Sequence, residues 1–256
     1  MPIFVRANRG PSTPRVHCRV SAWLLLAGMF LTSTTGCSTF TAQGRNAEGV
    51  RLCQQARYPE ALQEFQEATY EEPGNADGYY NLAATHHRLG LAERRSAELA
   101  QAETCYYQCL DHDPNHRDAH RGLAVLMVQE GRREEAFRLL VGWVDREPRR
   151  ADPKIELARL YEEFGNRAAA QERLTEALAV EPNSARAWAA MGKIREDLGQ
   201  HRQALADYQN SLAYDRYQPE VAARTVALQT ALAPAPIMAD AVSPSRTVNL
   251  PPPTWR

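Results

Sequence analysis

The sequence lacks the short motifs that mark many enzyme families. It contains no G-x-S-x-G nucleophile turn, no phosphate-binding loop and no H-E-x-x-H metal motif. Its neighbouring acids, such as Glu134–Glu135 and Glu162–Glu163, are most simply solvated residues on helix faces. We therefore expect a protein that is not an enzyme, with no catalytic residues, no cofactor and no small-molecule substrate.

An excess of basic residues is also missing, and lysine is almost absent. Lys154 and Lys193 are the only lysines, so arginine carries the positive charge. The formal net charge is −1, and residues 1–36 hold arginines but no acid, so that without them 26 basic residues face 31 acidic ones. A mildly acidic chain is not typical of a nucleic-acid-binding protein, and no nucleic-acid partner is expected.

The apolar run Val20–Leu31 near the N-terminus is too short to span a membrane comfortably. It has about twelve residues, whereas a transmembrane helix needs about 20. A basic region that ends at Arg19 precedes it, which is the order found in a signal peptide. The sequence thus predicts an exported protein whose signal peptide is cleaved. The alternative is that the apolar run stays in place as an uncleaved anchor.

The segment Thr34-Thr35-Gly36-Cys37 resembles the lipobox of bacterial lipoproteins, although Thr34 stands where Leu is commoner. The resemblance implies that residues 1–36 are a lipoprotein signal peptide and that the Cys37 thiol is lipidated, with an uncleaved anchor or ordinary export as the alternatives. In Gram-negative lipoproteins a residue other than Asp after this cysteine, here Ser38, implies sorting to the outer membrane. We expect a lipid-anchored protein of the bacterial cell envelope, in the outer membrane and facing the periplasm.

Three columns of residues recur in register along the rest of the chain. The step is 34 residues, except for one step of 41 around repeat two. A first column of small residues comprises Gly49, Ala83, Ala124, Ala158 and Gly192; a second comprises Ala61, Ala102, Ala136, Ala170 and Ala204; a third comprises Pro73, Pro114, Pro148 and Pro182. Each unit reads as two amphipathic helices, and such a hairpin needs neighbours of its own kind to bury its apolar face.

These columns resemble the tetratricopeptide repeat (TPR) family, with its pattern W-x2-L-G-x2-Y, A-x3-F and P. The matches are Trp188-x2-Met191-Gly192, Leu157-Ala158-x2-Tyr161, and Ala61-x3-Phe65 followed by Pro73. The resemblance covers roughly residues 42 to 216. It implies an all-α fold, a TPR helical-hairpin solenoid with a right-handed superhelix, of about five repeats plus a C-terminal capping helix.

The expected organisation follows from these segments. We predict a signal peptide at 1–36, a short linker at 37–44, the solenoid at 45–216, a capping helix at 219–232 and a Pro-rich disordered tail at 233–256. The repeats span about 42–75, 76–116, 117–150, 151–184 and 185–218. The end of the tail, residues 251–256, is also compatible with a polyproline ligand.

Repeat two carries seven extra residues between Ala83 and Ala102. Seven residues are nearly two helical turns, so a lengthened second helix would keep its buried face in phase. The stretch Glu93–Leu99 contains helix formers and neither Gly nor Pro. We therefore predict a longer second helix, with a longer loop as the alternative.

The TPR resemblance implies that first helices line a concave groove that binds a protein or peptide partner. The candidate groove residues are Tyr80, Asn81, His87, Arg121, Val125, Ile155, Arg159 and Lys193. Among them Arg121, Arg159 and Lys193 suggest a basic strip suited to an acidic peptide, and ordinary solvated helix faces are the alternative. Of the family's carboxylate clamp only Asn81 matches, so binding of a free C-terminal carboxylate in that manner is not expected.

Repeat two and the start of repeat three are rich in thiols and imidazoles. The cluster comprises His86, His87, Cys105, Cys109, His112, His116 and His120. Two thiolates and a histidine can hold zinc, but Cys109 stands in a small-residue core column with Ala68 and Ala177. We therefore predict no metal site.

These observations favour a non-catalytic scaffold for protein–protein interaction, held at the cell envelope by a lipid. The alternative is an accessory regulator of an envelope enzyme, related to peptidoglycan or a protease, or a pilus or secretion assembly factor. The identity of the partner and the oligomeric state do not follow from the sequence.

Overall fold

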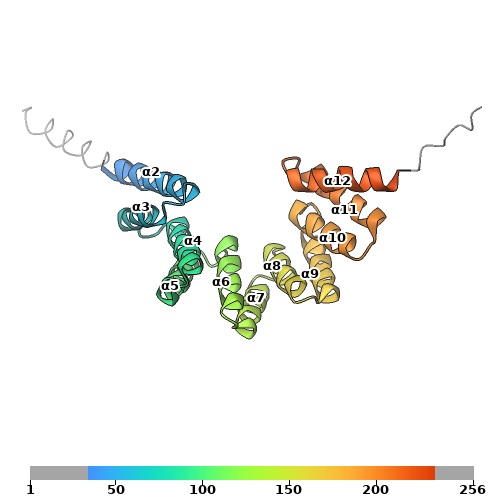
Figure 1. The fold of residues 1–256 in the computed structure, drawn as a ribbon, viewed down its shortest axis with the longest axis horizontal. Helices are drawn as coiled ribbons and strands as arrows, with labels where there is room; N and C mark the ends of the chain where they lie inside the picture. Colours follow the sequence, from blue (N-terminus) through green and yellow to red (C-terminus); the bar gives the residue numbers. More distant parts are fainter. Residues whose placement is uncertain (1–33, 234–256) are drawn as a thin grey trace, which may run out of the picture. The chain divides into compact units, whose positions relative to one another are not determined.

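The structure is a computed structural model that describes residues 34–233, with side chains from residue 41 onward. The predicted tail beyond Ala233, the predicted signal peptide before Thr34 and the side chain of Cys37 lie outside the described residues. Between residues 34 and 233 the chain forms helices and no strands. The helices are α2 (Thr34–Gln54), α3 (Tyr58–Glu71), α4 (Ala76–Glu93), α5 (Ser96–His112), α6 (Arg117–Gln129), α7 (Arg133–Arg146), α8 (Asp152–Glu163), α9 (Arg167–Val180), α10 (Ala185–Asp197), α11 (His201–Tyr214) and α12 (Pro219–Leu232) (Figure 1).

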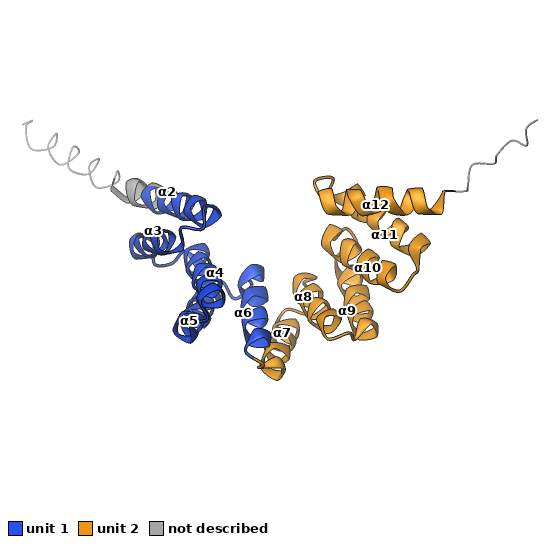
Figure 2. Cartoon of the chain, viewed as in Figure 1, with its two compact units in different colours: residues 1–130 blue, residues 131–256 orange. Residues whose placement is uncertain are grey.

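The chain divides into two compact units, residues 1–130 and 131–256 (Figure 2). In the first unit α2 packs against α3, α4 packs against α5, and α4 also contacts α3 and α6. In the second unit α8 packs against α9, α10 against α11, and α12 against α11. In each unit a helix therefore contacts mainly its neighbours in the sequence, as stacked hairpins do.

The two columns of small residues face inward, as the sequence predicted. The second-helix alanines from Ala61 to Ala204 are all 0% exposed, and the first-helix column is buried throughout. Its two glycines are needed for close approach. A Cβ on Gly49 would lie 2.5 Å from the Phe65 ring, and one on Gly192 would lie 2.7 Å from the Tyr208 ring. The predicted all-α hairpins are confirmed, and the small residues let the two helices of each hairpin meet.

Residues 37–44, predicted as a linker, are instead part of α2, which begins at Thr34. The segment contains no proline, and Ala42 within it is 0% exposed. A helix extends readily once packing has formed its first turns. The first hairpin therefore begins before Arg45, the residue at which we expected its first helix to start.

Arg45, which stands where the family prefers tryptophan, links the two helices of the first hairpin. Its Nε lies 3.0 Å from Glu71 Oε1 and its Nη1 lies 3.3 Å from Glu64 Oε2, while Glu67 also forms an ion pair with it. All three acids belong to α3. Ion pairs at this position thus join α2 to α3.

The seven extra residues of repeat two lengthen both helices, so the prediction of a longer second helix alone was incomplete. The turn residue Arg94 lies eleven positions after Ala83, against seven for the equivalent residues of the other hairpins, and eight before Ala102, against five. Four residues thus extend α4 and three extend α5. The added turns pack together, because a Cβ on Gly90 would lie 2.6 Å from Leu99 Cδ2.

Between residues 34 and 233 every hairpin turn contains a residue with positive φ, but only three of these five residues are glycine. Gly131, Gly165 and Gly199 have φ values of 77°, 75° and 73°, whereas Ala56 and Arg94 have 59° and 54°. The left-handed region costs a residue with a Cβ about 1–2 kcal/mol. The first two hairpins therefore carry backbone strain that the other three avoid.

Replacing Arg94 by Gly should stabilise the protein. Glycine relieves the backbone strain, but it also has a larger conformational entropy in the unfolded chain, which offsets part of that effect. The free energy of unfolding should therefore rise by roughly 0.5–1 kcal/mol. Urea unfolding of the purified protein measures it. Gly165→Ala is the reverse control and should destabilise; a loss of stability in the Arg94→Gly protein would contradict the strain argument.

Helix α12 stands where the first helix of a sixth repeat would begin, 34 residues after α10. Pro219 opens it, a position where the missing N–H costs no hydrogen bond. Thr225 and Leu228 are buried, Val221 is partly buried against the last core cluster, and Leu232 is 36% exposed. Within residues 34–233 no helix is both long enough and apolar enough to cross a bilayer.

Candidate functional site

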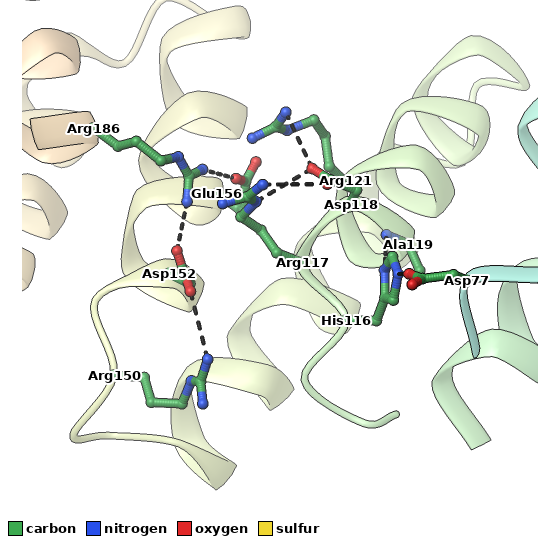
Figure 3. Close-up of polar contacts among 10 residues, drawn as sticks. All are labelled: Asp77, His116, Arg117, Asp118, Ala119, Arg121, Arg150, Asp152, Glu156 and Arg186. Atoms are coloured by element: carbon green, nitrogen blue, oxygen red, sulfur yellow. Dashed lines mark hydrogen bonds and ion pairs between the residues drawn. The ribbon is translucent and has the colours of Figure 1, made fainter. Parts of the chain in front are cut away.

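In the second unit the first helices of successive repeats are joined by ion pairs. Arg186 on α10 reaches both Asp152 and Glu156 on α8 (Figure 3). Lys193 on α10 pairs with Glu162 on α8, and Arg224 on α12 lies 3.0 Å from Glu196 on α10. The first helices α8, α10 and α12 therefore carry side chains of both charge signs, and Glu156 among them is buried, at 2% exposed.

The three cations of the predicted basic strip are each paired with an acid. In the first unit Arg121 lies 3.5 Å from Asp118 of its own helix. In the second unit Arg159 lies 3.9 Å from Glu156, and Lys193 contacts Glu162. Each cation thus has an acid beside it, and Glu156 is shared between Arg159 and Arg186. Within each unit these residues form mixed-charge pairs instead of a run of unpaired cations.

Two predicted groove residues lie in the interior. Ile155 is 5% exposed and packs in the core of α8, α9 and α10, with Leu174 and Met191. His87 is 8% exposed; its Nε2 lies 2.7 Å from Gln129 Oε1 and its Nδ1 lies 3.4 Å from the Tyr106 hydroxyl. Each lies one helical turn from a column alanine, Ile155 before Ala158 and His87 after Ala83. That spacing was the signal in the sequence that they face inward.

Tyr80, Asn81 and Val125 are half-buried on the first helices of the first unit. The Tyr80 ring lies 5.1 Å from the His116 ring and 6.3 Å from the Tyr106 ring, measured between centroids. Burial and the charge of Asp118 raise the pKa of Tyr80, while Arg121 and Arg88 oppose the shift. Tyr80 is therefore a neutral phenol at physiological pH, fixed by aromatic neighbours.

The two cysteines on α5 are buried and are not activated thiols. Burial raises the pKa of Cys105 to about 11 and that of Cys109 to about 12, so both stay protonated near neutral pH. Cys109 is 0% exposed, in the core column where Ala68 and Ala177 are likewise buried. These thiols are therefore part of the packing.

The histidines near them already have protein partners. His86 Nδ1 lies 2.7 Å from Glu98 Oε2, and His112 stacks on Tyr79. His116 Nδ1 accepts the Ala119 N–H, while its Nε2 lies 3.0 Å from Asp77 (Figure 3). Within the part of the chain that the structure describes, no three His, Cys, Asp or Glu residues are grouped to hold a metal ion.

Comparison with protein families identifies the hairpins. Three tetratricopeptide repeat models match residues 87–151, 127–194 and 185–218. Together they cover residues 87–218 without a gap, just over half of the chain. The chain belongs to the tetratricopeptide repeat family. Its fold is that of protein–protein interaction scaffolds, in which stacked repeats present an extended surface.

Solved structures show the same fold. The thermophilic TPR protein TTC0263 of Thermus thermophilus is 24% identical, with a TM-score of 0.55 over 74% of this chain and 99% of its own. A TPR protein from Parabacteroides merdae is 17% identical, with a TM-score of 0.56 over 82% of this chain and 79% of its own. The comparison with curated protein sequences found no significant match.

Proposed function

We propose that this TPR protein is a non-catalytic scaffold that binds a protein or peptide partner on its first helices, and that a lipid on Cys37 holds it at the bacterial cell envelope. One observation carries the binding part. The hairpins pack through their small-residue columns, which leaves other first-helix side chains, such as Asn81 and Arg159, half-buried or exposed. A partner can contact these side chains without disturbing the core.

The ion pairs between repeats support the same proposal. Arg186 spans α8 and α10, and Arg224 spans α10 and α12, so the side chains of one face hold each other in place. A surface that is ordered before binding loses less conformational entropy when a partner arrives. The first helices therefore form a preorganised binding surface.

The sequence around Cys37 supports the lipid anchor. Each acyl CH2 that enters the bilayer contributes about 0.8 kcal/mol, so two or three chains bind far more firmly than one. Because α2 is helical from Thr34, the eight residues from Cys37 to Arg45 advance about 12 Å, at 1.5 Å each. An extended linker of that length could span about 28 Å. The first hairpin would thus lie close to the bilayer surface.

Cys37→Ser should release the protein from the membrane. Without the thiol there is no acyl chain, so the variant should leave the membrane fraction and lose label from a clickable fatty acid. Fractionation and N-terminal mass spectrometry in the native cell measure both effects. Cys53→Ser is the control and should behave as wild type. A mature N-terminus other than Cys37 would disprove the anchor.

Charge reversal tests the binding surface separately. Arg121→Glu and Arg159→Glu each place an acid beside an existing acid, on the first helix of a different unit. We expect each variant to retain fewer partners from solubilised envelope fractions than wild type does. Arg138→Glu, on the exposed side of the second helix α7, is the control. Retention of every partner by both variants would argue against binding on the first helices.

A further inference from the structure

Arg88 differs from the other arginines of the first helices. In α2, α6, α8, α10 and α12 every arginine forms an ion pair with an acid. Arg88, the only arginine of α4, is exposed and forms no ion pair with any residue from 41 to 233. Its charge acts instead on the phenols of Tyr80 and Tyr106, where it opposes their raised pKa. Arg88 is thus an uncompensated cation on the face of α4 that carries Tyr80.

Neighbouring residues complete a stripe along α4. Asn81, Ala84, Arg88, Leu91 and Ala92 recur at helical spacing and so share one face, opposite the buried Ala83 and Gly90. The Asn81 side-chain amide forms no hydrogen bond within the described part of the chain. Leu91 is 46% exposed, unusually high for so large an apolar residue on this helix. From the N-terminal to the C-terminal end of the stripe, Asn81 offers an amide, Arg88 a cation, and Leu91 with Ala92 an apolar surface.

The insertion in repeat two creates the apolar end of this stripe. First helices α6, α8 and α10 have 12 or 13 residues, whereas α4 has 18 and continues through Leu91 and Ala92. The added turn is held in place: His86 pairs with Glu98 at 2.7 Å, and Gly90 lies against Leu99. The extension is therefore an ordered helical surface.

We propose that this stripe binds an acidic peptide segment of the partner. This proposal rests on the scaffold function proposed above. A carboxylate of the peptide pairs with Arg88, an apolar side chain one or two positions away covers Leu91 and Ala92, and a peptide-backbone group bonds to Asn81. Asn81 and Arg88 are seven residues apart, about 10.5 Å along the helix. That distance equals about three residues of extended peptide. Anionic membranes fit less well, because they attract clusters of basic residues and not a single arginine.

Selection from a phage library of random nine-residue peptides against the purified full chain tests the proposal. The wild-type protein should enrich peptides with Asp or Glu one or two positions from a large apolar residue. Arg88→Gln should abolish that enrichment, and Arg88→Glu should favour basic residues instead. Arg138→Gln, also exposed, is the matched control and should select the wild-type peptides. Arg88 is exposed, so its variants should keep the melting temperature of wild type.

The affinity of a selected peptide gives a second measurement. Changing its acid to the amide, or Arg88 to Gln, should weaken binding at least about tenfold, since each change removes a hydrogen bond between charged groups. Leu91→Ser should weaken it as well. If selected peptides ignore Arg88→Gln but fail to bind Arg159→Glu, the α4 site is wrong and the scaffold function stands. If no peptide is selected, or if the full chain binds phosphatidylglycerol vesicles through Arg88 instead, the proposal is overturned.

Discussion

Replacing Trp143 by Ala should lower the free energy of unfolding by about 3–5 kcal/mol. Trp143 on α7 is 0% exposed and belongs to the largest fully buried side chains. It occupies the second-helix column that holds Ala68, Cys109 and Ala177 in other repeats, so an indole stands at a core position where those repeats have a smaller side chain. Alanine would leave a large cavity, and packed helices relax only partly to close one.

Urea unfolding followed by far-UV circular dichroism measures this loss, since the indole itself is no longer available as a fluorescent probe. Val141→Ala removes an apolar side chain from the same helix at a position that is 39% exposed. Its cost should stay within about 0.5 kcal/mol, as for most surface substitutions. Equal losses in the two variants would mean that Trp143 does not fill the interior as described.

Ala170→Leu should cost about 1–3 kcal/mol by overpacking a helix contact. Ala170 is 0% exposed on α9, in the core cluster with Ala158 of α8 and Leu174. The contact leaves no room for three further carbon atoms, so α8 and α9 must move apart or leucine must adopt a strained rotamer. Either response weakens the packing of this hairpin.

Ala168→Leu is the matched control, because it introduces the same side chain two residues earlier at an exposed position. Its melting temperature should stay close to that of wild type. Hydrogen exchange locates the damage, since stacked hairpins contact mainly their neighbours. Amides of α8, α9 and α10 should lose protection in Ala170→Leu. An unchanged melting temperature for that variant would contradict the register of the repeats.

The repeat pattern predicted the hairpin fold because small residues are required wherever two helices meet closely. Gly49 and Gly192 show the requirement directly, with aromatic rings where a Cβ would lie. The α2–α3 hairpin was predicted from the same columns, although the family models match only from residue 87. The spacing of the small residues was therefore sufficient to predict this hairpin, because it marks where two helices meet.

The candidate site was predicted less well, because exposure depends on what packs from other helices. Ile155 and His87 carry residue types found on binding surfaces, yet both are buried by neighbouring helices. Lys193 was expected in a basic strip, but it forms an ion pair with Glu162 of the preceding repeat. Arg88, which the sequence analysis did not single out, is the first-helix arginine that pairs with no acid among residues 41–233.

The sequence by itself determined the hairpins, their number and their register, since a repeat of 34 residues with small side chains at fixed places allows few other ways to bury the apolar faces. Only the tertiary structure decided how seven inserted residues divide between α4 and α5, and which charges remain unpaired. Both depend on contacts between helices, such as Gly90 with Leu99 or Arg186 with Asp152, whose geometry no single helix specifies.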